Sequence, residues 1–173
     1  MATLVQQKHY WAALQKPQKN QPNYTIKDNF WKDQNFQILP YRKGALFAFW
    51  LDNQILKKSN YTKSLDDLMR DILLKSTTEN RNFTDDWFLD LVQPYLDKNI
   101  AYYFQKHIIS NVDIDFASDD VIKGLKVAYV DKIPVFQLTA DKEQAKATFL
   151  NQKWLANQQQ KARPQQDGLS VIY

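Results

Sequence analysis

The chain has 173 residues, of which 44% are hydrophobic and 14% aromatic, so it is long and apolar enough to bury a core. It has no cysteine, which excludes disulfide frameworks, cysteine zinc sites and thiol catalysis, and its three glycines are too few for a glycine-rich phosphate loop. The net charge of +4 comes from interspersed charges of both signs, so we expect no nucleic acid partner. Residues 1–16 lack the apolar core of a signal peptide and no apolar run is long enough to span a membrane. We therefore expect a soluble protein with no signal peptide and no membrane partner, in a compartment that the sequence leaves open.

The first half of the chain contains the strongest helix signal. Residues 4–15 have helical apolar spacing, and residues 17–37 are polar with scattered aromatic anchors, which predicts a helix and then a long connector. Residues 40–58 are predicted to form a helix that begins at Pro40, because proline suits a first helical turn. Residues 44–51 are apolar on every face, so this helix is predicted to lie at the centre of the core.

Three shorter helices are expected to follow. Ser64 and Thr84 are each suited to an N-cap, and acidic residues that favour a helix N-terminus come soon after each of them. Residues 98–109 have the spacing of a third helix, and the short links predict an antiparallel bundle around residues 41–56. The apolar stripe expected on the first of these helices is Leu65, Leu68, Met69, Ile72 and Leu73.

The pattern changes after residue 111. Residues 126–138 contain two short apolar runs around a polar turn, which predicts a small β-hairpin, and Asp141 is expected to cap a last helix. We therefore predict a mainly α protein. A helical bundle would occupy residues 1–110, and residues 111–173 would hold the hairpin, the C-terminal helix and a loose tail.

No metal site is apparent in the sequence. A thermolysin-type zinc site needs two histidines four residues apart on one helix, with a glutamate between them. The chain has only His9 and His107, which lack that spacing, so we expect no metal and no cofactor in this chain. A serine–histidine–aspartate triad is disfavoured on the same ground. The paired aspartates at 66–67, 85–86 and 119–120 suit either acid–base chemistry or helix capping, and their positions at expected helix starts favour capping.

Tyr41 is the residue that stands out among the aromatic side chains. Most other aromatic residues fall on apolar stripes, whereas Tyr41 comes at the expected start of the most apolar helix, beside Arg42 and Lys43. Its hydroxyl has two interpretations from the residues alone. It is either bonded to backbone at the edge of the core or directed at something outside the bundle.

Two sequence blocks carry a resemblance to a known family. They are Pro40-Tyr41-Arg42-Lys43-Gly44-Ala45-Leu46, followed by Ala48 and Leu51-Asp52, and then Ser64-Leu65-Asp66-Asp67-Leu68-Met69-Arg70. Together they resemble the glycyl aminopeptidase family of zinc peptidases, many of which carry a PDZ domain after the catalytic domain. The Tyr-x-Lys-Gly element is also similar to that of the aminopeptidase N type of gluzincin. The resemblance covers about residues 30–110, and residues 1–29 and 111–138 more weakly.

The resemblance implies a thermolysin-like catalytic domain, in which a zinc-binding half precedes a helical half. The bundle would then be the C-terminal helical subdomain, and Tyr41 would stabilise the oxyanion of the scissile carbonyl together with zinc. Lys43 and Gly44 match the motif and are expected only to position Tyr41. The H-E-x-x-H helix and the glutamate ligand would lie upstream of residue 1, so zinc is implied only for that half. The glycine-containing turn expected after the third helix is Ser110-Asn111-Val112 here.

Two functions of different classes follow. The first is the C-terminal helical portion of a zinc aminopeptidase-like protein, inactive alone, with a zinc-binding N-terminal half or a second copy as partner. A peptide substrate is expected only for the complete enzyme. The alternative is a stand-alone helical protein-interaction module that keeps the peptidase scaffold without its chemistry.

Overall fold

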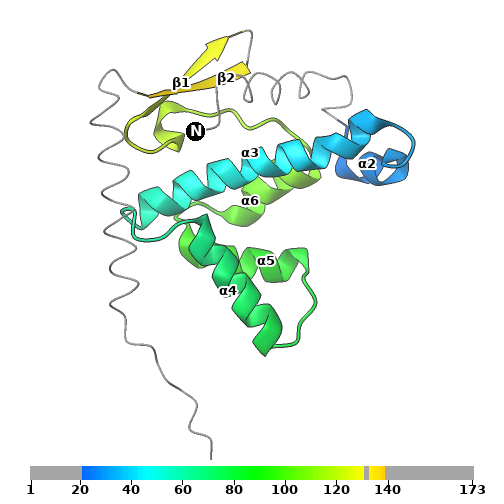
Figure 1. Cartoon of the computed structure of the whole chain (residues 1–173), viewed down its shortest axis with the longest axis horizontal. Coiled ribbons are helices and arrows are strands. Elements are labelled where there is room, and N and C mark those ends of the chain that lie inside the picture. Colours follow the sequence, from blue (N-terminus) through cyan, green and yellow to red (C-terminus); the bar gives the residue numbers. More distant parts are fainter. Residues whose placement is uncertain (1–20, 131–132, 139–173) are drawn as a thin grey trace, which may run out of the picture.

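A computed structural model describes residues 21–130 and 133–138, and the helices expected at 4–15 and from Asp141 onward lie outside these residues. The described part is mainly helical with one two-stranded antiparallel hairpin, which confirms the predicted fold class (Figure 1). None of the described helices is long and apolar enough to span a membrane. The elements in chain order are α2 (Asn23–Asn29), α3 (Gln34–Lys58), α4 (Leu65–Thr78), α5 (Asp85–Val92), η2 (Gln93–Tyr95), α6 (Ile100–Phe104), η3 (Gln105–Ile109), η4 (Ser118–Asp120), β1 (Leu125–Val130) and β2 (Ile133–Leu138).

The long helix α3 begins earlier than predicted. Asp33 is its N-cap, and the Asp33 carboxylate accepts a hydrogen bond from the backbone N–H of Asn35 at 2.8 Å. Pro40 therefore lies inside the helix and not in its first turn, so the predicted start at residue 40 was wrong. The expected connector over residues 17–37 was also wrong in part, because it contains α2 and the first turn of α3.

The starts of α4 and α5 agree with the sequence. The backbone N–H of Ser64 donates to the Asp67 carboxylate at 2.8 Å, and the N–H of Leu65 donates to Asp52 of α3 at 2.8 Å. The Thr84 hydroxyl accepts from the N–H of Trp87 at 3.3 Å. These side chains satisfy N–H groups that have no partner within a helix, which explains why the chain enters a helix at both points.

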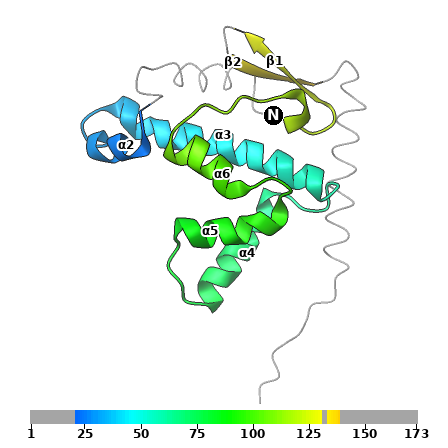
Figure 2. The ribbon, with the colours of Figure 1, turned by 180° about the vertical axis from the view of Figure 1, so that it is seen from behind.

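The segment predicted as one helix over 98–109 has two parts. Asn99 caps α6, and the chain then continues as the π-helical turn η3. Both ribbon views show α6 running alongside α3, with the α4–α5 pair on one side and the hairpin on the other (Figures 1 and 2). Asn111 follows η3 with a φ of 60°, a left-handed conformation that asparagine tolerates better than most residues.

The core surrounds α3, as the sequence predicted. Trp50 is only 2% exposed, and its ring stacks on Phe47 at 5.5 Å and on Tyr103 of α6 at 4.7 Å between centroids. The stripe expected on α4 is only half buried. Leu68 and Ile72 are buried there, whereas Met69 and Leu73 are exposed, which corrects the prediction for those two residues.

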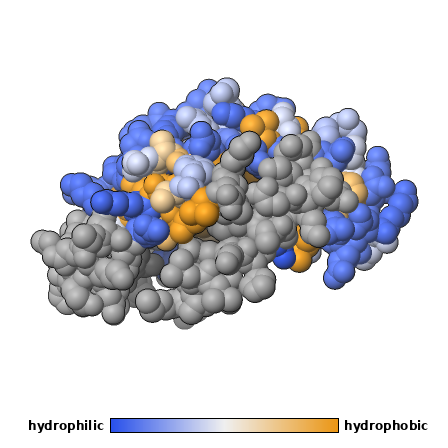
Figure 3. Space-filling model, turned by 90° about the horizontal axis from the view of Figure 1, so that it is seen from above, coloured by the Kyte–Doolittle hydropathy of each residue, from blue (hydrophilic) through white to orange (hydrophobic). Residues whose placement is uncertain are grey.

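The hairpin packs onto the same core through aromatic rings. Val127 of β1 pairs with Phe136 of β2, and the Phe136 ring lies 4.8 Å from Phe49 of α3 and 5.0 Å from Phe116. From the hairpin side, apolar side chains form small patches among hydrophilic ones (Figure 3). The hairpin thus covers part of α3 that the other helices leave open.

Candidate functional site

Tyr41 lies on the outside of α3. Its side chain is 72% exposed, and no described residue forms a hydrogen bond with its hydroxyl. Trp31 and Ile38, which come just before it in the chain, are also exposed hydrophobic residues. The interpretation in which the hydroxyl is bonded to backbone at the edge of the core therefore finds no support in the described part of the chain.

Lys43 lies on the opposite side of the helix from Tyr41. Two positions along an α-helix turn the side-chain direction by about 200°. Lys43 is only 8% exposed, and its Nζ donates to the backbone carbonyl of Asn111 at 2.6 Å. The same Nζ lies 3.4 Å from the carboxylate of Asp113. Because a buried ammonium group is stable only with such partners, Lys43 ties α3 to the turn that follows η3.

Further contacts converge on this turn, and we call the set Lys43, His107, Asn111, Val112 and Asp113 the Lys43 junction. The amide of Asn111 donates to the backbone carbonyl of Gln21, which attaches the segment before α2. Nδ1 of His107 lies 2.8 Å from the carbonyl oxygen of Val112. The sequence did not predict this junction. Its one signal was a lysine within the most apolar helix, since a buried lysine requires partners from elsewhere in the chain.

The electrostatics of the junction disfavour a charged histidine. Burial lowers the pKa of His107 from its usual 6.5, and the positive charges of Lys106 and Lys43 act in the same direction. The hydrogen bond with Val112 and the charge of Asp113 oppose this shift but do not reverse it.

Gly44, the last residue of the motif, has no steric requirement for glycine. A Cβ atom placed on Gly44 would meet no described atom within 4 Å. Its expected role in positioning Tyr41 therefore does not come from a close approach of another chain segment among the described residues.

Of the aspartate pair at 119–120, Asp120 belongs to a second buried polar cluster, whereas Asp119 is exposed. The Asp120 carboxylate accepts from Nζ of Lys98 at 2.7 Å and from the N–H of Ala117 at 3.0 Å, and the backbone carbonyl of Asp120 accepts from Gln54 at 3.1 Å. Burial alone would raise the pKa of Asp120, but the bonds from Lys98 and Ala117 outweigh it and lower the pKa. A carboxylate held charged in this way suits a structural tie and not proton transfer.

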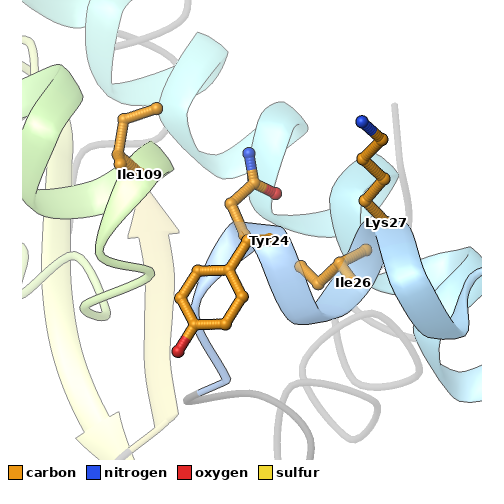
Figure 4. Close-up of a pocket in the computed structure, with 5 residues that line it drawn as sticks. Tyr24, Ile26, Lys27 and Ile109 are labelled. Atoms are coloured by element: carbon orange, nitrogen blue, oxygen red, sulfur yellow. The ribbon is translucent and has the colours of Figure 1, made fainter.

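The residues described contain no group of three His, Cys, Asp or Glu side chains that could hold a metal ion, and His9 lies outside them. An open pocket of about 420 Å³ lies between α2 and η3, lined by Asn23, Tyr24, Ile26, Lys27 and Ile109 (Figure 4). Tyr41 is not among the residues that line this pocket.

The fold and these contacts define the chain as a mainly helical protein with an outward tyrosine and a buried lysine junction on one long helix. No protein-family model matches the sequence, and neither a curated protein nor a solved structure matches it.

Proposed function

We propose that the chain is the C-terminal helical portion of a zinc aminopeptidase-like protein of the glycyl aminopeptidase type. The observation that carries the proposal is that the tyrosine and the lysine of Tyr-x-Lys-Gly lie in opposite environments. Tyr41 presents an exposed hydroxyl, while Lys43 is buried and bonded to Asn111. A tyrosine that serves a substrate must face outward, and a residue that positions it must be fixed to the scaffold.

In the proposed reaction, the Tyr41 hydroxyl donates a hydrogen bond to the oxygen of the scissile peptide carbonyl as that oxygen becomes negatively charged. A rigid carrier is needed for such a donor, because a displaced hydroxyl does not reach the transition state. Lys43 supplies part of this rigidity by joining α3 to Asn111 and Asp113. Zinc, when bound by the zinc-binding half, would polarise the same carbonyl and activate water. Because zinc is implied only for the zinc-binding half, the chain by itself is proposed to be inactive.

Replacement of Tyr41 by phenylalanine in the complete zinc-loaded enzyme tests the proposal. Loss of one oxyanion donor lowers kcat by about 10²–10³-fold and leaves substrate binding nearly unchanged. Tyr102→Phe is a matched control, because Tyr102 is another exposed tyrosine, on α6. Equal values of kcat for the wild type, Tyr41→Phe and Tyr102→Phe would refute the role of Tyr41.

The alternative, a helical interaction module, is favoured by the outer face of α4. Met69, Leu73 and Leu74 are all exposed there, although they belong to an amphipathic helix whose other face packs in the core. Exposed apolar side chains that are close together often mark a contact with a partner. Sedimentation of the wild type and of a Leu73→Glu variant tests this function. Self-association that Leu73→Glu abolishes would favour the module, and a monomer at every concentration would count against self-association through α4.

A further inference from the structure

The turn over residues 110–113 is held by contacts from separate segments of the chain. Lys43 of α3 binds the Asn111 carbonyl, His107 of η3 binds the Val112 carbonyl, and the Asn111 side chain binds Gln21. The backbone of Asn111 adopts a left-handed conformation, with a φ of 60°. Since this conformation is sparsely populated by residues other than glycine, the surrounding bonds stabilise it.

The protonation state of His107 follows from its partner. A carbonyl oxygen only accepts hydrogen bonds, so Nδ1 must carry the proton, and in the neutral ring Nε2 carries none. The ring is buried and stacks on Tyr103 of α6, with 6.1 Å between centroids. A second proton on Nε2 would place a full positive charge in this buried position.

The charges around the ring come from three segments. Lys43 of α3 and Lys106 of η3 are positive, whereas Asp113 of the turn is negative. Asp113 is half exposed and already forms an ion pair with Lys43 at 3.4 Å. Tyr103 of α6 adds an aromatic face. A protonated His107 would be repelled by two nearby ammonium groups, and the opposing charge of Asp113 is already paired with Lys43.

We propose that the Lys43 junction is a pH-sensitive latch. When Nε2 of His107 takes up a proton, the contacts that hold the 110–113 turn to α3 and to Gln21 weaken. The latch does not depend on any peptidase activity. It belongs to the chain itself and is expected to work in the isolated protein.

The direction of the pH dependence follows from the lowered pKa of His107. The unfolded or opened state binds the proton more tightly, near the usual pKa of 6.5. The junction is therefore at full strength above that pH, and it weakens as the pH falls from there toward the lower pKa of the closed state.

Amide hydrogen exchange of the whole chain tests the latch. The N–H groups of Ser110 and Val112 donate to Gln105 at 2.8 Å and to Lys106 at 3.0 Å, so their exchange reports opening of the turn. Between about pH 7.5 and 5.5, their protection, corrected for the intrinsic exchange rate, should fall several-fold, while that of Ile55 in α3 stays constant.

Two variants separate the latch from a general effect of acid. His107→Asn keeps an N–H donor but does not titrate, so its protection at Ser110 and Val112 should not change with pH. His9→Gln removes the other histidine and should behave as the wild type. A pH-independent wild type, or the same decline in His107→Asn, would overturn the proposal.

A direct titration keeps the proposal testable if His107→Asn does not fold. The ring resonances of His107, distinguished from those of His9 by the His9→Gln variant, should report proton uptake with a midpoint below 6.5. A midpoint at or above 6.5 would show that the junction does not disfavour protonation of His107, and it would refute the proposal.

Discussion

Removal of the Trp50 side chain should strongly destabilise the core, because Trp50 is among its largest fully buried side chains. Trp50 is 2% exposed, and its ring stacks on Phe47 and on Tyr103 of α6. A buried tryptophan removes about 200 Å² from water, which at about 25 cal/mol per Å² is worth about 5 kcal/mol. Measured changes from large aromatic residues to alanine cost about 3–5 kcal/mol, so we expect Trp50→Ala to destabilise the fold by this amount.

Phe49 provides the comparison on the same helix. It is only partly buried and contacts Phe116 and Phe136 near the hairpin, so Phe49→Ala should cost less than Trp50→Ala. Urea denaturation followed by far-UV circular dichroism measures both values. The free energy of unfolding of a small domain is only about 5–15 kcal/mol, so Trp50→Ala can prevent folding. Trp50→Phe is a milder variant for that case. Unchanged midpoints in both alanine variants would show that α3 is not the centre of the core.

Four further predictions concern the motif and the two histidines. Tyr41→Phe should change the free energy of unfolding by less than about 0.5 kcal/mol, because the hydroxyl is exposed; a loss of 1 kcal/mol or more in urea denaturation would indicate a buried bond. Gly44→Ala should stabilise the protein by about 0.5–1 kcal/mol, since glycine disfavours a helix interior and the space is open; a lower melting temperature would contradict this. The isolated chain should bind no stoichiometric zinc, and elemental analysis showing about one zinc per chain, lost on substitution of His9 or His107, would refute that prediction. The free energy of unfolding should decrease as the pH falls below 6.5, because His107 has a lowered pKa, and His107→Asn should reduce this dependence in denaturation at several pH values.

Local signals predicted the helices well where a capping side chain and an apolar stripe agree. Ser64 and Thr84 both stand at helix starts as expected. The Asp67 carboxylate accepts the backbone N–H of Ser64, and the Thr84 hydroxyl accepts the N–H of Trp87. The start of α3 was mispredicted because Pro40 is typical of a first turn, whereas the structure has Asp33 as the N-cap. Here the helix continues through the proline.

Long-range contacts could not be predicted from spacing alone. Lys43 and Asn111 are 68 positions apart, and only the folded chain brings the ammonium group to that carbonyl. The exposure of Met69 and Leu73 was missed for a related reason. Periodicity marks which side of α4 is apolar, but it does not say how wide a strip the neighbouring helices cover. The outward direction of Tyr41 agrees with one of the two interpretations that the sequence left open.

The intact mass and zinc content of the native polypeptide, isolated from its source cells, test the proposed function most directly. A helical portion of a zinc aminopeptidase-like protein should be recovered in a polypeptide heavier than 20.5 kDa, or together with a partner that binds zinc. Recovery of a 20.5 kDa polypeptide without zinc and without a zinc-binding partner would contradict the proposal and favour the interaction module.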